Sequence, residues 1–85
     1  MECILTFQTT SASMEAEKRL KEAGIENSAM SVPSSLKAGC GICLCLKQAF
    51  LAAAEKVLAD AGVSIGAVYL KETIDSKFVF TPLVR

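Results

Sequence analysis

The sequence of 85 residues contains no histidine. It therefore lacks the side chain that most often serves as a base at neutral pH and as a nitrogen ligand of metal ions. Neither sign of charge is in excess, because lysine and arginine together number nine, as do aspartate and glutamate. The chain also has few aromatic residues, four phenylalanines and one tyrosine. Without a basic stripe, this is not the composition of a nucleic-acid-binding protein.

Long apolar runs are also missing. The longest nearly uncharged stretch, residues 38–46, is far shorter than a membrane span. The N-terminus carries an acidic residue, Glu2, and lacks the hydrophobic region of a secretory signal. We therefore expect a cytoplasmic protein with no membrane partner. Cysteines in that compartment are normally reduced, which favours thiol chemistry or metal binding over a structural disulfide.

The most informative feature that is present is a cysteine cluster. Three of the four cysteines lie in the segment Gly39-Cys40-Gly41-Ile42-Cys43-Leu44-Cys45. Cys40 stands between two glycines, which permit unusual backbone angles and close approach. Such a turn can aim backbone N–H groups at a sulfur anion, and Lys37 can help to stabilise a thiolate. Cys40 is thus predicted to be an accessible, reactive thiol with Lys37, Gly39 and Gly41 as binding neighbours; the alternative is an ordinary tight turn.

The other two cysteines of the cluster admit several interpretations. Cys40 and Cys43 form a C-x-x-C pair, which can close a redox disulfide or supply two metal ligands. The pair leads into a strand and not into a helix, so no helix dipole is expected to stabilise the Cys40 thiolate. Cys43 and Cys45 alternate onto one strand face about 6.6 Å apart, near the limit of disulfide reach. We predict that Cys43 assists Cys40 and that Cys45 packs; either can instead be a small buried hydrophobe.

A metal site would need one more ligand. Structural zinc takes four, and the cluster supplies three thiols. The remaining cysteine, Cys3, alternates with Leu5 and Phe7 and is expected on the helix-covered face, away from Cys43 and Cys45. An iron–sulfur cluster also takes four cysteine ligands and would lack one here. We therefore expect no metal and no other cofactor, unless two chains share a site.

The order of apolar patterns predicts a β-α-β-β-α-β fold. In the first helix, Ala12, Ala16, Leu20 and Ala23 recur at helical spacing, and Gly24 follows as a cap. This order is the ferredoxin-like arrangement, an α+β sandwich with an antiparallel sheet and both helices on one face. The predicted strands cover residues 3–7, 28–32, 42–46 and 65–70, and the helices residues 12–23 and 48–61.

The C-terminal residues lie beyond this minimal fold. We predict a ferredoxin-like domain over residues 1–71 and an extension over residues 72–85, with residues 71–77 as a polar linker. Residues 78–81, which include two phenylalanines, can add a strand that Pro82 limits. The phenylalanines can cover the open sheet face or pair with a second chain, so a homodimer is one expectation. The zero net charge does little to keep copies apart.

The chain resembles the small bacterial family of selenium/sulfur carrier-like proteins over residues 3–69. The resemblance rests on short matches along the chain, namely a first strand ending in Phe7, Glu17-Lys18, Val32-Pro33 and Gly39-Cys40-Gly41. It implies a compact α/β domain that carries sulfur or selenium on cysteine, with Cys40 as the key residue. Cys43 and Cys45 depart from the family pattern, in which apolar or small residues follow.

We therefore predict a sulfur or selenium carrier. A domain of this size leaves little room for a deep pocket, so we expect an accessory protein more than a stand-alone enzyme. The Cys40 thiolate would accept a sulfur atom from a donor such as a cysteine desulfurase, and Cys43 would release it by forming a disulfide. Two alternatives stay open: a non-catalytic binding or oligomerisation module, since this fold serves many functions, and a thiolate metal-binding protein.

Overall fold

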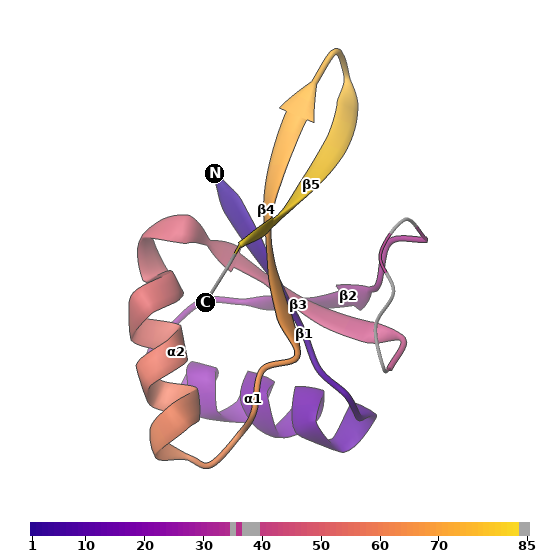
Figure 1. The fold of residues 1–85 in the computed structure, drawn as a ribbon. Helices are drawn as coiled ribbons and strands as arrows, with labels where there is room; N and C mark the ends of the chain where they lie inside the picture. Colours follow the sequence, from indigo (N-terminus) through magenta and orange to yellow (C-terminus); the bar gives the residue numbers. More distant parts are fainter. Residues whose placement is uncertain (35, 37–39, 84–85) are drawn as a thin grey trace.

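The protein is an α+β domain with a five-stranded sheet and two helices (Figure 1). The computed structural model describes residues 1–34, 36 and 40–83. In chain order the elements are β1 (Glu2–Thr6), α1 (Thr10–Glu22), β2 (Ser28–Ser31), β3 (Ile42–Lys47), the short 3-10 helix η1 (Gln48–Phe50), α2 (Leu51–Asp60), β4 (Ala67–Ile74) and β5 (Lys77–Leu83). The predicted ferredoxin-like order is confirmed, with an additional strand at its end.

The sheet has the strand order β2-β3-β1-β4-β5, and every neighbouring pair is antiparallel. β1, β3 and β4 are therefore interior strands, while β2 and β5 form the two edges. Both helices pack against the same face (Figure 1). The opposite face, which carries no helix, is called the open face below.

Helix α1 is delimited by its two ends. The Thr9 side chain accepts a hydrogen bond from the Ala12 backbone N–H at 3.1 Å, which satisfies one of the free donors at the helix start. At the other end Gly24 adopts φ 78°, and the Ile25 N–H donates to the Leu20 carbonyl at 2.9 Å. Glycine has no Cβ to strain this left-handed conformation, so the chain can leave the helix here.

The helix-side cluster is the larger of two apolar clusters. It joins alternate residues of the central strands to one stripe from each helix. Its buried members are Cys3, Leu5, Phe7, Ala16, Leu20, Ile25, Leu44, Leu46, Leu51, Ala54, Leu58 and Val68. Cys3 lies here, as strand alternation predicts.

The open-face cluster is smaller and holds the two strand cysteines. Its buried members are Ile4, Cys43 and Cys45. Although no helix covers this face, Cys43 is completely buried, because partly buried side chains pack over the cluster. These covering residues are Met30, Val32, Leu36, Tyr69 and Phe80. Phe80 thus covers the open face, which is one of the two roles predicted for it.

The predicted linker over residues 71–77 is wrong. β4 continues to Ile74, Asp75 and Ser76 turn the chain with φ angles of 51° and 64°, and β5 follows at once. Positive φ at both central residues is typical of the two-residue turn that joins antiparallel strands. Residues 71–73 are polar because this part of the ribbon projects away from the core (Figure 1). The predicted boundary between residues 71 and 72 therefore falls inside β4.

Candidate functional site

Cys40 lies two residues before the start of β3, at the end of the loop that follows β2. The Val32 N–H donates to the Gly41 carbonyl at 3.0 Å and so continues the β2–β3 pairing toward the loop. Cys40 is partly exposed, whereas Cys3, Cys43 and Cys45 are buried. Two of its predicted neighbours, Lys37 and Gly39, lie outside the described residues.

The Cys40 side chain is held at the edge of the helix-side cluster. It packs against that cluster, and its Sγ–H donates to the Ile42 carbonyl at 3.1 Å. Gly41 is exposed, and a Cβ placed on it would meet no heavy atom within 4 Å among the described residues. The surface is therefore open at Gly41, beside the partly exposed Cys40.

Cys43 lies on the other side of the sheet. Its Sγ makes a weak hydrogen bond of 3.8 Å to the Ser31 carbonyl within the open-face cluster. Burial raises the pKa of the Cys43 thiol, the sulfurs of Cys45 and Cys40 raise it further, and Lys71 opposes them. The C-x-x-C spacing thus does not present two sulfurs to one surface, because Cys40 packs with one cluster and Cys43 with the other.

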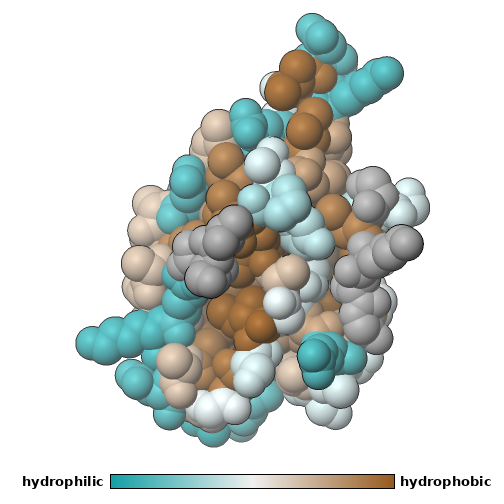
Figure 2. Space-filling view, in the orientation of Figure 1, coloured by the Kyte–Doolittle hydropathy of each residue, from teal (hydrophilic) through white to brown (hydrophobic). Residues whose placement is uncertain are grey.

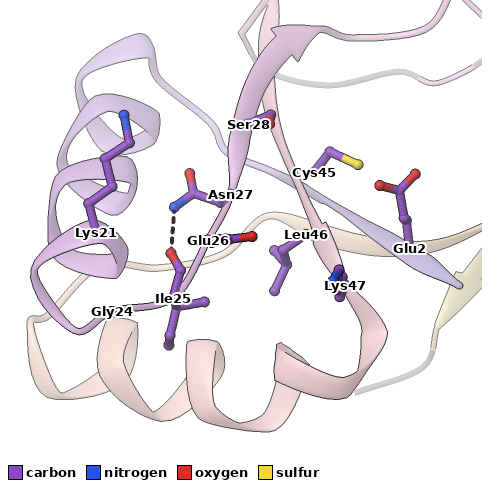
Figure 3. A pocket seen from close by; sticks show the side chains of 10 residues that line it. All are labelled: Glu2, Lys21, Gly24, Ile25, Glu26, Asn27, Ser28, Cys45, Leu46 and Lys47. Carbon is purple, nitrogen blue, oxygen red and sulfur yellow. Dashed lines mark hydrogen bonds between the residues drawn. The ribbon is translucent and has the colours of Figure 1, made fainter.

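Cys45 lines a pocket at the opposite end of β3 (Figure 3). Burial raises the pKa of the Cys45 thiol, and so does the Glu2 carboxylate, toward which its sulfur points, while Lys71 opposes both. The pocket has a volume of about 490 Å³ and is lined by Glu2, Lys21, Gly24, Ile25, Glu26, Asn27, Ser28, Cys45, Leu46 and Lys47.

Glu2 and Lys71 are the neighbours of the strand thiols that sequence reasoning missed. They face each other across the β1–β4 pair, with 3.5 Å between the Lys71 Nζ and the Glu2 Oε1. Their partnership depends on the register of strands nearly seventy positions apart, which no local pattern reveals. Among the residues that the structure describes, no group of three or more histidine, cysteine, aspartate or glutamate side chains is placed to hold a metal ion.

The raised thiol pKa values predict that stability falls at alkaline pH. In the unfolded chain these thiols ionise near pH 9.0, whereas in the folded protein Cys43 and Cys45 keep their protons to higher pH. The contribution of the two protonated thiols to the free energy of unfolding is fully present below pH 9. It is lost as the pH rises through the folded pKa values, because the unfolded state releases these protons at a lower pH than the folded state does. Urea unfolding followed by circular dichroism between pH 7 and 10 should show this decline.

The matched variants for this measurement are Cys43→Ala and Leu58→Ala. Removing the Cys43 thiol should flatten the decline above pH 9. The Leu58 side chain is also fully buried but does not titrate, so its variant should lose stability equally at every pH. An alkaline slope in Cys43→Ala as steep as in the wild type would contradict the prediction.

Comparisons with known proteins point to one family. Residues 2–70 match the family model described as "Putative Se/S carrier protein-like". The match runs from β1 into β4, includes Cys40, and ends before the turn at residues 75–76. No curated protein and no solved structure matches the chain. None of the described helices is long and apolar enough to cross a membrane.

Proposed function

The chain belongs to the Se/S carrier protein-like family, and we propose that it carries a sulfur or selenium atom on Cys40. The observation that supports this choice is exposure: Cys40 is partly exposed, and the other three cysteines are buried. A carrier thiol must meet the active groups of two other proteins in turn. Of the four thiols, Cys40 has the position for such encounters.

The loading step needs no external oxidant or reductant. The Cys40 thiolate attacks the outer sulfur of a persulfide on a donor protein, such as a cysteine desulfurase. A bond forms between Cys40 Sγ and that sulfur, the donor's S–S bond breaks, and the donor cysteine leaves with the electron pair as a thiolate. The product is a persulfide on Cys40, and a selenium atom on the donor would transfer in the same way.

Unloading is proposed to be the reverse step with an acceptor. An acceptor thiolate attacks the outer atom of the loaded Cys40, which leaves as a thiolate. In the other route predicted from the sequence, the Cys43 thiolate attacks Cys40 Sγ, forms a disulfide and expels hydrosulfide. Cys43 is buried on the open face, with a raised pKa, so the direct hand-over has the stronger support. The role of Cys43 as a resolving thiol stays a prediction.

The carrier role predicts that Cys40 alone takes up sulfur. We expect the wild-type protein to gain one sulfur atom on incubation with a cysteine desulfurase and cysteine, followed by intact-mass measurement. Cys40→Ser should gain none, since its hydroxyl is a far weaker nucleophile at neutral pH than a thiolate. Peptide mapping of the loaded protein should place the added atom on Cys40.

The matched controls separate carrying from resolving. Cys45→Ser should load like the wild type, because its thiol is buried at the opposite end of β3. In Cys43→Ser the persulfide should persist as long as in the wild type if hand-over is direct, and longer if Cys43 resolves it. Equal sulfur gain by Cys40→Ser and the wild type would refute the carrier proposal.

A further inference from the structure

The β4–β5 ribbon projects from the body of the domain (Figure 1). Its distal part exposes three large apolar side chains, with Ile74 50%, Phe78 62% and Val79 39% accessible. An isolated two-stranded ribbon is only marginally stable in water, and a third strand or a covering surface is usually needed. The family match ends at residue 70, so the distal part of β4 and all of β5 lie beyond the matched segment that carries Cys40.

The outer edge of β5 has a defined set of hydrogen-bonding groups. The two-residue turn makes Ile74 and Lys77 the first hydrogen-bonded pair of the ribbon, and such pairs recur at every second residue. The N–H groups of Phe78 and Phe80 therefore point away from β4. Pro82 occupies the next outward position, where its missing N–H costs no hydrogen bond to β4.

The outward residues of β5 also share one sheet face. Phe78, Phe80 and Pro82 are paired with Thr73, Lys71 and Tyr69 of β4, and Lys71 faces Glu2 on the open face. Figure 2 shows apolar surface both on the body and on the projecting ribbon. The aromatic side chains of β5 thus extend the open-face cluster to the free edge.

We propose that β5 pairs antiparallel with β5 of a second copy of this chain, with Phe80 opposite its own counterpart. In this register each Phe80 N–H donates to the other copy's Phe80 carbonyl, and each Phe78 N–H donates to the other copy's Pro82 carbonyl. All the outward donors of β5 are then satisfied, and the two sheets become one ten-stranded sheet. The phenylalanines and prolines of both copies meet on one face.

Self-complementarity supports a second copy as the occupant. The outward edge has N–H donors at Phe78 and Phe80 and none at Pro82. When two such edges run antiparallel with Phe80 opposite Phe80, each Phe78 lies opposite Pro82 of the other copy, and every outward N–H meets a carbonyl. A two-fold axis also makes the same patch serve both partners, as in most homodimers. Since the net charge is zero, no overall repulsion opposes the association.

This proposal is independent of sulfur carrying. β5 is one edge of the sheet, and β2, whose following loop leads to Cys40, is the other. In the dimer the two Cys40 side chains would lie near opposite ends of the continuous sheet, and each would stay accessible. Loss of the dimer should therefore leave the alkylation rate and sulfur loading of Cys40 unchanged.

The first test uses the wild-type protein. Analytical ultracentrifugation should show a monomer that becomes a dimer as concentration rises. Amide hydrogen exchange measured by NMR at the same concentrations should slow at Phe78 and Phe80 by at least about tenfold in the dimer. Val79, whose N–H points to β4, serves as the control, with protection that changes less. A monomer at every concentration, or a dimer without protection at Phe78 and Phe80, overturns the proposal.

The second test checks the register by charge. Val79 and Thr81 are exposed, lie on the other face of β5, and would face each other across the two-fold axis. The variant V79K/T81K brings like charges together, whereas V79K/T81E brings opposite charges together. The second variant should dimerise roughly tenfold or more tightly than the first, from two cross-strand charge pairs. Equal dimerisation of two folded variants would overturn the Phe80-centred register.

Discussion

Iodoacetamide added to the native protein at neutral pH is expected to alkylate Cys40 at least about a hundredfold faster than any other cysteine. Cys40 is partly exposed, while Cys3 and Cys43 have no accessible surface and Cys45 has 9%. Buried thiols of a central strand react only when the strand opens, and such openings cost up to the full unfolding free energy of several kcal/mol, ~5 or more.

The pKa values act in the same direction as burial. The thiolate is the reactive form, and burial raises the pKa of both Cys43 and Cys45. Cys45, which lines a pocket, should be the second to react. The measurement is quenched alkylation with peptide mass spectrometry, and the control is the same reaction in concentrated urea, where all four rates should converge. Native alkylation of Cys43 as fast as that of Cys40 would contradict the assignment of the exposed thiol.

The helices and the central strands could be predicted because their apolar spacing is local. Ala16 and Leu20 fall on one helical face and are both buried, and Gly24 adopts the left-handed angle that ends the helix. Alternation along residues 42–46 predicts that Cys43 and Cys45 share one face, and alternation along residues 3–7 predicts that Cys3 lies on the other; the two apolar clusters confirm both. Such patterns can be recognised in the sequence because every strand that packs against the core must place apolar residues at alternate positions.

The β4–β5 ribbon could not be predicted in full, because its distal residues do not pack against a core that would impose an apolar pattern on them. Residues 71–73 are polar or long and amphipathic, as a loop would be, and the turn uses Asp75 and Ser76 instead of the more typical glycine. The pairing of Glu2 with Lys71 likewise follows from a register that only the folded sheet defines. The C-x-x-C spacing of Cys40 and Cys43 likewise does not show which apolar cluster each sulfur packs against; the structure places Cys40 against the helix-side cluster and Cys43 in the open-face cluster.

The largest loss of stability is expected for Phe7→Ala. Phe7 directly follows β1, and with 1% of its surface accessible it is the largest of the fully buried side chains among the described residues. It packs in the helix-side cluster, at whose edge Cys40 lies. Removing a buried phenylalanine side chain costs about 3–5 kcal/mol, a large part of the roughly 5–15 kcal/mol that holds a domain folded. Chemical denaturation followed by circular dichroism measures the loss.

The same substitution should erase much of the selectivity among the thiols. A loss of about 3 kcal/mol raises the population of the unfolded state roughly a hundredfold, and the alkylation rates of Cys3 and Cys43 should rise with it. The rate of Cys40, which needs no opening, should change little. Phe7→Leu is the matched control, because a hydrophobic replacement closer in volume should cost less than about 1.5 kcal/mol. Equal losses of stability in both variants would contradict the packing role of Phe7. If Cys40 accelerated together with Cys43, Cys40 would itself react through unfolding, and its role as the exposed carrier thiol would fail.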